Sequence, residues 1–484
     1  MRTPYFPLLR PRLAARKAFS PAFSLPPDCS RLQTLLQSFF PPFLLSQCDE
    51  KENSRERLWT LRLTFWTFLW QVLHPGHSCR QAMHNAFSQA ERLLRKLPTL
   101  SAYCQARTRL PPDNLRRIDQ HVIQAAQRRR PADSLWHGWN LKVVDGSSSS
   151  MPDTSKSQLK WPQPKGQKKG CGFPVVKWVG LFCLATGVLL GKGLGNLHCH
   201  DLRLFQLLWD FLRPGDLVVA DRGFSSYAMY ALFQLKGLAA VFRLQTGRKV
   251  KNPKKSRMKK GQRLGAGDHL ILWKKPYEKP AWMSAPDWAK IAPSLTLRII
   301  SFQAQTRGFR PKHFVLATTL LDPEKYPTQD LIDLYARRWK VEGLIRQMKT
   351  IMKMEILRCQ SPLLIEKEMI MHRIAYNLIY CLMLESALCH YVEVIEISYA
   401  GTLSALQAFT SGDRCSKRRK ISLYEQLLQA IAAERLPKRP GRKEPRAVKR
   451  RPKPYPLLTK PRHQYKEIPH RSRYRKNQPI KSGA

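Results

Sequence analysis

The sequence predicts an α/β fold in which helices cover a mixed β-sheet. Two short apolar runs, residues 141–145 and 216–221, each end in an aspartate. Two further apolar runs, 175–185 and 188–190, are joined by a Thr-Gly pair, which is typical of a β-hairpin. Helical segments separate the later strands. The resulting order of strand, hairpin, helix, strand, helix and strand is the one expected of a ribonuclease-H-like fold.

Each predicted element lies between residues that break regular structure. The pair Pro214-Gly215 forms a turn before the second aspartate-ended run, and Asp201 is placed to cap the helix that follows it. We expect strands at 141–145, 175–190 (as a hairpin), 216–221 and 238–244, and helices at 202–212 and 225–236.

The charge of the chain indicates a polyanionic partner. Its 84 lysines and arginines outnumber its 34 aspartates and glutamates and give a formal net charge of +50, while 43% of the residues are hydrophobic. A folded protein this basic attracts polyanions, so we expect it to bind nucleic acid, with an acidic membrane surface as the second candidate.

Cysteine usage and hydropathy indicate a reducing compartment and no membrane span. The 11 cysteines form no CxxC pair, which argues against a disulfide framework or a zinc ribbon and is typical of the cytosol. The N-terminus lacks the apolar core of a signal peptide. Residues 58–73 are apolar but number only about 16 and include Arg62, so we expect a buried helix there.

Composition divides the chain into seven segments. The helical unit near the start is expected either to bind DNA ends or to serve only in packing. A helix beginning near Thr328, with that residue as its N-cap, resumes the main domain after a β-rich insertion. The segments are a Pro-rich start (1–55), a helical unit (56–135), a first part of the catalytic core (136–245), the insertion (246–326), a second part of the core (327–385), a C-terminal helical region (386–436) and a basic tail (437–484).

The most informative stretch covers residues 335–349. At about 100° per residue, Tyr335, Arg338, Glu342 and Lys349 fall within roughly 60° of one helix face. An apolar stripe runs beside this polar one. Such sorting is expected of a helix that places a carboxylate at a metal ion and its cations on nearby phosphates. The alternative is an amphipathic helix with an ordinary charged face.

Three carboxylates stand out by their positions. Asp145 and Asp221 end predicted core strands, and Glu342 lies on the helix expected to pack on the same sheet. Neighbouring carboxylates repel unless divalent cations neutralise them, and Mg²⁺ prefers oxygen ligands. Two such ions flanking a phosphodiester would activate the attacking oxygen and stabilise the leaving one. Either aspartate alone could instead serve only to form a turn.

These motifs resemble those of the DDE transposases of bacterial insertion sequences, of the IS4 type. The matching motifs are Asp145-Gly-Ser147, Asp221-Arg-Gly-Phe224 and Tyr335-x₂-Arg338-x₃-Glu342-x₆-Lys349, and the third matches completely. Supporting stretches lie at 101–111, 151–154, 170–174 and 373–378. The resemblance covers roughly residues 56–460 and leaves the Pro-rich start outside.

The resemblance implies a role for each matching residue. Two catalytic Mg²⁺ ions, for which Mn²⁺ can substitute, would be bound by Asp145, Asp221 and Glu342. The DNA backbone near the transposon end would be contacted by Tyr335, Arg338 and Lys349.

The resemblance also implies the reaction. Hydrolytic nicking would free a 3′-OH, which would attack the opposite strand to give a hairpin end; once the hairpin is opened, the 3′-OH would attack target DNA. By spacing, Phe314 stands where relatives that form hairpins carry an aromatic side chain stacked on a flipped base. Arg243 is a candidate phosphate contact, also by spacing. Both residues could instead serve in strand packing or as surface charge.

The protein implied by this resemblance is a DNA transposase. It would act on double-stranded DNA, both transposon ends and target, as a homodimer on paired ends in the bacterial cytoplasm at the nucleoid, with no membrane partner. Two alternatives stay open: an inactive or repurposed DNA-binding relative, and a two-metal nuclease that cuts without strand transfer. The intact carboxylate triad and third motif favour an active enzyme.

Overall fold

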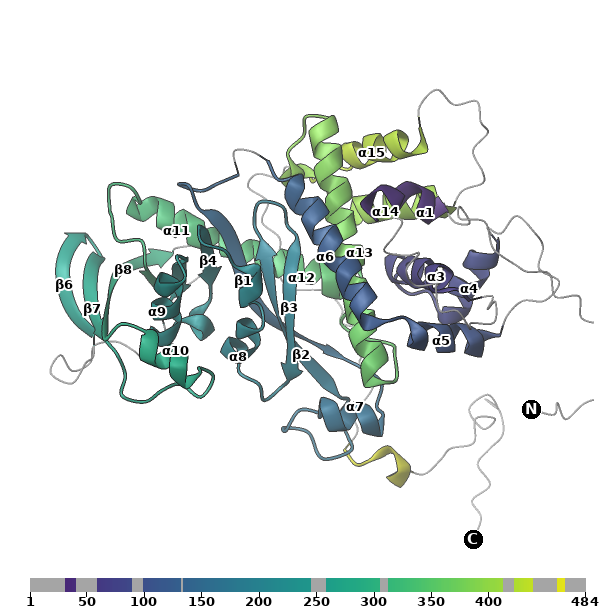
Figure 1. Ribbon diagram of the computed structural model, residues 1–484, viewed down its shortest axis with the longest axis horizontal. Coiled ribbons are helices and arrows are strands. Elements are labelled where there is room, and N and C mark those ends of the chain that lie inside the picture. The colour runs from purple at the N-terminus through teal and green to yellow at the C-terminus, as the bar shows by residue number, and fades with distance from the viewer. Residues whose placement is uncertain are drawn as a thin grey trace, which may run out of the picture.

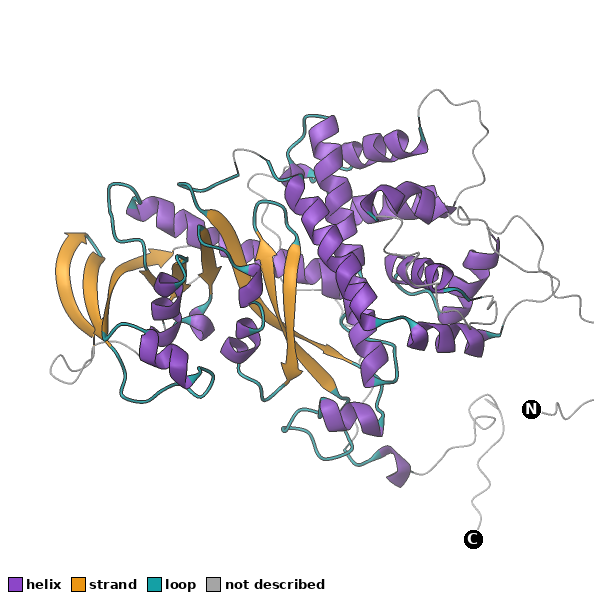
Figure 2. Ribbon diagram, viewed as in Figure 1, coloured by secondary structure: helices purple, strands orange, loops and turns teal. Residues whose placement is uncertain are grey.

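One continuous β-sheet of nine strands organises the protein. The computed structural model describes residues 31–40, 59–88, 99–131, 134–244, 258–304, 312–411, 422–437 and 459–465. The strands are β1 (Asn140–Ser150), β2 (Val175–Cys183), β3 (Leu189–Asn196), β4 (Asp216–Ala220), β5 (Ala239–Arg243), β6 (Met258–Gly265), β7 (Asp268–Lys274), β8 (Ser294–Ala304) and β9 (Lys312–Thr318). Their order across the sheet is β3-β2-β1-β4-β5-β9-β8-β7-β6. Figure 2 shows this sheet on one side of the molecule and a group of helices on the other.

The first five strands form the predicted ribonuclease-H-like core. β1 pairs antiparallel with β2 and β2 with β3, whereas β1, β4 and β5 run parallel. The predicted hairpin is confirmed as β2–β3, and its connection passes through Gly187 at φ 72°, a conformation that favours glycine. The helices α8 (Asp201–Gln206) and α9 (Tyr227–Leu235) follow the order read from the sequence, but His200, not Asp201, occupies the N-cap of α8.

β1 is longer than predicted, so Asp145 does not end it. The parallel pairing of β1 with β4 stops at Val144 and Ala220, immediately before the two aspartates. The antiparallel pairing with β2 continues to Ser150. Asp145 therefore lies on a strand that is supported on one side only, beside the point where β4 ends and Asp221 begins a loop.

The insertion extends the core sheet. Its last strand, β9, pairs antiparallel with β5, and β8, β7 and β6 follow in turn with antiparallel pairing. A short helix, α10 (Ala285–Lys290), connects β7 with β8. The β-rich character of this segment was predicted from its sequence, but its continuity with the core sheet was not.

A buried ionic cluster joins the insertion to the next helix. Arg298 on β8 is fully buried and donates to both carboxylate oxygens of Asp268 on β7, at 2.6 to 3.1 Å. The hydroxyl of Thr328 donates to the same carboxylate at 2.7 Å. The expected N-cap role of Thr328 is therefore wrong, because α11 (Thr328–Ala336) begins at Thr328 with Pro327 at the cap position.

Helices from both ends of the chain pack together beside the sheet (Figure 1). The long helix α13 lies against α6, and several of the others pack around them. The helices of this group are α1 (Arg31–Leu36), α3 (Leu61–Leu73), α4 (Cys79–Ser88), α5 (Leu100–Arg109), α6 (Pro112–Arg128), α13 (Pro362–Cys389), α14 (Tyr399–Ser411) and α15 (Leu423–Ala433). None of the helices in the described ranges is long and apolar enough to cross a membrane.

α13 is fixed to both the sheet and the N-terminal helices. The side chain of Asn377 bonds both the N–H and the carbonyl of Leu189 on β3, at 3.0 Å each. The buried carboxylate of Asp119 on α6 pairs with Arg373. Of the predicted Pro-rich start (1–55) and basic tail (437–484), all but residues 31–40, 437 and 459–465 lie outside the described residues.

Candidate active site

The third motif lies on a helix that changes its geometry three times. α11 passes into a 3₁₀ turn (Arg337–Trp339), then into α12 (Lys340–Arg346) and a π-turn (Gln347–Ile351). A 3₁₀ turn is tighter than an α-turn and a π-turn is wider, so the constant 100° per residue used for the sequence does not hold here. Single π-turns inside helices occur frequently at functional sites.

Asp145 is a partly buried carboxylate held by its own strand. Its Oδ1 accepts the N–H of Gly146 at 2.8 Å. Burial raises the pKa of Asp145, and the negative charges of Asp221 and Glu342 add to this rise, while the Gly146 N–H and Arg338 oppose it. The three carboxylates predicted from the sequence therefore influence one another electrostatically in the folded protein.

Arg338 stands between two of these carboxylates. Its Nη1 lies 3.6 Å from Oδ2 of Asp145, and its Nη2 lies 4.0 Å from Oε1 of Glu342. The Arg338 side chain is only 7% exposed, whereas that of Glu342 is 56% exposed. The rings of Tyr335 and Trp339 flank its guanidinium at 5.6 and 5.0 Å. Arg338 is thus an internal counter-cation, although its sequence position suggested a DNA contact.

Asp221 has its own pair of partners. The hydroxyl of Tyr335 donates to Oδ1 of Asp221 at 3.4 Å, and Nη1 of Arg243 lies 4.0 Å from the same oxygen. Burial raises the pKa of Tyr335 to about 12, so the phenol stays protonated and remains a donor. These contacts join the end of β4, the end of β5 and the signature helix at one place.

Phe314 lies next to this group. The guanidinium of Arg243 is 4.7 Å from the centre of the Phe314 ring, and Phe302 on the neighbouring strand stacks on that ring at 5.5 Å. Phe314 is 9% exposed. Arg243 and Phe314, both singled out by spacing, therefore contact each other at the margin of the carboxylate cluster.

Lys349 is separated from the carboxylate cluster. It lies in the π-turn, and its Nζ is 3.9 Å from Oε1 of Glu355. Glu355 in turn belongs to a segment bound to the end of β1, because its carbonyl accepts the N–H of Ser150 at 2.9 Å. The four polar residues of the third motif therefore do not form a single row: three lie near Asp145 and Asp221, and Lys349 lies seven residues beyond Glu342, in the π-turn.

The chemistry of the three carboxylates suits a hard divalent cation. Carboxylate oxygens are the ligands that Mg²⁺ prefers, and the mutual repulsion seen at Asp145 is the charge pattern such an ion relieves. In the described part of the chain, however, no three His, Cys, Asp or Glu side chains converge closely enough to form a metal site as they stand. At Asp145 and Glu342 the positive charge comes from Arg338.

Sequence reasoning missed the residues that hold the π-turn. The hydroxyl of Tyr380 donates to Oε1 of Gln347 at 2.9 Å, and that of Tyr399 lies 2.9 Å from Sδ of Met352. Both tyrosines are buried, and Tyr376 packs against both. No local pattern indicates these contacts, because the partners are 33 and 47 positions apart.

The chain is similar to known transposases. The chain matches the family model of the transposase DDE domain over residues 138–378. It is 25% identical over 441 residues to Transposase InsG for insertion sequence element IS4 of Escherichia coli (strain K12), covering 88% of this chain and 94% of that protein. The cryo-EM structure of the piggyBac transposase synaptic complex with hairpin DNA aligns over 86% of each chain at 10% identity and a TM-score of 0.39. The family model and the relative, which aligns over most of both chains, together support the assignment of this chain to the IS4-type DDE transposases.

Proposed function

We propose that the protein cleaves transposon ends in a Mg²⁺-dependent reaction and transfers the freed 3′ ends into target DNA, as a cut-and-paste transposase. The observation that supports the proposal is the electrostatic interaction of Asp145 on β1 with Asp221, just after β4, and with Glu342 on the signature helix. Burial raises the pKa of Asp145, and the negative charges of Asp221 and Glu342 raise it further. Membership of the transposase family supports the same reading.

The three carboxylates are the proposed ligands of two Mg²⁺ ions, with Mn²⁺ able to substitute. When bound, such ions activate the attacking oxygen and stabilise the leaving one. In each step one P–O bond forms as another breaks: water attacks first, and the freed 3′-OH attacks later. Because every step exchanges oxygens on phosphorus, the same carboxylates serve all of them.

The cations and the phenol around the carboxylates are the proposed DNA contacts. Tyr335, Arg338 and Lys349 would hold the backbone near the transposon end, and Arg243 would take a further phosphate. For Arg338 this role requires release from Asp145, to which it is paired at 3.6 Å. We place the reaction in the bacterial cytoplasm at the nucleoid, with a homodimer assembled on paired ends.

The hairpin step is the most detailed part of the proposed reaction. It assigns Phe314 to stacking on a flipped base, a contact that stabilises by about 1–3 kcal/mol in general. Arg243 now lies over the Phe314 ring at 4.7 Å, so a base can reach that face only after Arg243 moves. Binding of a DNA phosphate by Arg243 would favour that movement.

A cleavage assay on duplex DNA carrying the element's two ends tests the proposal. Wild-type protein with Mg²⁺ should give 3′-OH ends, hairpins on a denaturing gel and joined products with a target plasmid. Asp145→Asn, Asp221→Asn and Glu342→Gln should each lose cleavage and keep DNA binding. The matched control is Asp210→Asn, at an exposed aspartate outside the site, which should cleave like wild type.

Other outcomes of this assay point to the two alternatives. Binding of the ends without cleavage by the wild-type protein would mean an inactive relative. Cleavage without joined products would mean a two-metal nuclease. Sedimentation of the protein with and without paired ends would show whether a dimer forms on DNA; a single protomer per pair of ends would contradict the proposed assembly.

A further inference from the structure

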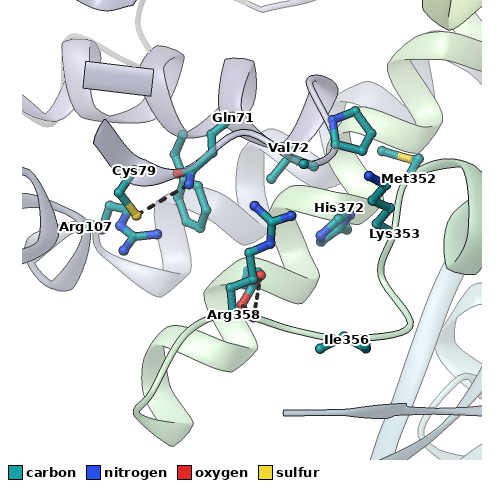
Figure 3. Close-up of a pocket in the computed structure, with 13 residues that line it drawn as sticks. Gln71, Val72, Cys79, Arg107, Met352, Lys353, Ile356, Arg358 and His372 are labelled. Carbon is teal, nitrogen blue, oxygen red and sulfur yellow. Dashed lines mark hydrogen bonds between the residues drawn. The ribbon is translucent and has the colours of Figure 1, made fainter. Parts of the chain in front are cut away.

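A pocket lies between the N-terminal helices and the segment that follows the signature helix (Figure 3). Its walls come from α3 and the turn after it, from α5, from residues 352–358 and from α13. The cavity has a volume of about 60 Å³. At about 10–15 Å³ for each water, this is room for roughly four to six water molecules, or for one tetrahedral oxyanion.

The pocket is lined by more positive than negative charge. Three of its side chains are cations, Arg107, Lys353 and Arg358, and one is a carboxylate, Glu368. The Glu368 oxygens already accept the N–H groups of Arg358 and Cys359 at 2.9 to 3.0 Å. The carboxylate is therefore occupied by backbone donors, and an excess of positive charge faces the cavity.

Two buried side chains of the pocket each carry a nitrogen whose hydrogen-bonding capacity is unused within the described part of the chain. Arg107 is 7% exposed and His372 is 6% exposed. Among the described residues, Nε of Arg107 and Nδ1 of His372 have no hydrogen-bond partner. The guanidinium of Arg107 contacts the thiols of Cys359 and Cys104, at 3.8 and 3.7 Å, and the rings of Phe68 and Tyr103, and it interacts electrostatically with the Glu368 carboxylate. Since the Glu368 oxygens already accept backbone N–H groups, a further anion beside Arg107 would stabilise this buried cation.

The opposite side of the pocket is open to solvent. Lys353 and Arg358 are exposed, and Ile356 between them is 65% exposed. Figure 3 shows the Arg358 side chain reaching into the space between Arg107 and His372. Lys353 has a left-handed backbone at φ 54°, and its Nζ lies so close to Gly76 that a Cβ there would be 3.1 Å away. A buried cationic floor thus faces an exposed cationic rim.

We infer that this pocket binds one phosphate-class oxyanion, held by Arg107, Lys353 and Arg358 with His372 as a further hydrogen-bonding group. Burial lowers the pKa of His372 to about 3, so its ring is neutral at pH 7 and one nitrogen carries a hydrogen. Charge-assisted bonds from guanidinium and ammonium groups to phosphate oxygens are the strong class of hydrogen bond. The oxyanion is either free inorganic phosphate or a phosphodiester of the DNA backbone; the second source rests on the proposed function.

An occupied pocket would couple two parts of the molecule. Residues 352–358 are tied to the end of β1, because Leu357 donates its N–H to the carbonyl of Ser150 at 2.8 Å. Ser150 lies five residues beyond Asp145 on the same strand, a separation of about 17 Å at roughly 3.3 Å per residue. A strand of DNA rises about 3.4 Å per nucleotide, so this separation corresponds to about five nucleotides.

Thermal unfolding with inorganic phosphate tests the site without any DNA. The full-length wild-type protein should show a saturable rise in Tm with phosphate over chloride of equal ionic strength. Lys353→Gln keeps a residue of ordinary size at the left-handed position and should raise the apparent Kd for phosphate about tenfold, the loss expected of one charge-assisted bond. Arg358→Gln should do the same, and Arg358→Lys should restore part of the affinity.

The control is Lys290→Gln, at an exposed lysine of the insertion, which should respond to phosphate like wild type.

A parallel measurement of duplex DNA affinity against salt distinguishes the two sources of the anion. Loss of one phosphate contact lowers the slope of log K against log salt by about one. A lower slope in Lys353→Gln assigns the pocket to DNA, and an unchanged slope with lost phosphate binding assigns it to the free anion. Equal phosphate responses in all variants, with equal slopes, would overturn the inference. Neither measurement depends on cleavage activity.

Discussion

Arg338 and Asp145 face each other inside the candidate active site, with Nη1 of the arginine 3.6 Å from Oδ2 of the aspartate. The same guanidinium reaches Glu342 at 4.0 Å through its other nitrogen. A side chain of the signature helix therefore neutralises the carboxylates that the proposed metal ions would also need. Arg338 and a bound metal ion would compete for the carboxylate oxygens of Asp145 and Glu342. This competition is the basis of the first prediction.

Arg338→Gln should increase the stabilisation of the protein by Mg²⁺. Without the guanidinium, Asp145 and Glu342 repel each other and gain more from a divalent cation, so the Mg²⁺ concentration at half-effect should fall about tenfold. Thermal unfolding against Mg²⁺ concentration measures this. Arg337→Gln, at the exposed neighbour in the same 3₁₀ turn, is the control. Identical Mg²⁺ responses in both variants and the wild type would count against competition.

Lys349→Ala should weaken DNA binding uniformly across sequences. Its ammonium pairs only loosely with Glu355, at 3.9 Å, and is available for a backbone phosphate. Removing one such contact should lower the slope of log K against log salt by about one. Fluorescence anisotropy on end-bearing duplexes at several salt concentrations provides the slope. Glu355→Gln, which releases Lys349, should bind at least as tightly as wild type; an unchanged slope in Lys349→Ala would argue against the phosphate contact.

Tyr380→Phe should slow DNA cleavage more than it lowers stability. The lost hydroxyl bonds Gln347 at the start of the π-turn, which follows the helix that carries Glu342 and contains Lys349. Tyr376→Phe is the matched control, because its hydroxyl donates instead to the carbonyl of Gly187 in the hairpin connection, at 2.8 Å.

Both variants lose a hydroxyl of the same buried cluster, and each lost neutral hydrogen bond costs about 0.5–1.5 kcal/mol in unfolding free energy. Single-turnover cleavage rates beside denaturant unfolding separate the two effects. Equal cleavage rates in Tyr380→Phe and Tyr376→Phe would mean that the π-turn does not depend on this bond.

The stability of the protein should rise with pH above neutrality because of Lys192. Burial lowers the pKa of this lysine from 10.5 to about 7, with Arg373 acting in the same direction and Asp119 opposing it. Between about pH 7 and 10.5 the unfolded chain binds a proton that the folded protein does not, so stability increases as pH rises. Below pH 7 both states are protonated and this contribution is constant.

Lys192→Met should remove that dependence. The difference in unfolding free energy between wild type and variant should change by about 1.4 kcal/mol per pH unit, the value for one proton. Urea unfolding at pH 7, 8 and 9 measures the difference directly and cancels the other titrating groups. A constant difference across this range would show that Lys192 is not neutral in the folded protein.

Asp268→Asn should strongly destabilise the protein. The change leaves the fully buried guanidinium of Arg298 without its carboxylate, and breaking such a buried pair costs about 3–5 kcal/mol. Asp287→Asn, in an exposed helix of the same insertion, removes the same charge from the surface and should change stability little. Denaturant midpoints of the two variants give the comparison; a small loss in both would contradict the buried pair's importance.

Local patterns in the sequence were sufficient for the core strands. The apolar runs before Asp145 and Asp221 become β1 and β4, and the Thr-Gly connection becomes the β2–β3 hairpin. These signals lie within a few residues of each other, where periodicity and turn chemistry act directly. The same patterns placed the two aspartates beside each other, because parallel strands that pair in register end together.

Contacts between distant residues were not accessible in this way. The buried Arg338 pairs with Asp145, which is 193 positions away by their numbering. A cation on one face of a helix gives the same sequence pattern whether it contacts carboxylates or solvent. The π-turn is likewise held by buried tyrosines of α13 and α14. Pairing of β9 with β5 joins strands with most of the insertion between them, and no local pattern specifies that register.

The pairing of β9 with β5 also decides which strand forms the outer edge of the sheet. β5 is almost wholly buried and apolar, and an exposed strand of that kind would be a template for aggregation. The insertion covers it and ends the sheet instead with β6, whose sequence Met-Lys-Lys-Gly-Gln-Arg-Leu-Gly carries three positive charges and two glycines. Charged, interrupted edge strands resist pairing with other chains. The insertion thus covers the edge of β5 against pairing with strands of other chains, and a version shortened by its removal would be expected to precipitate before its catalysis could be measured.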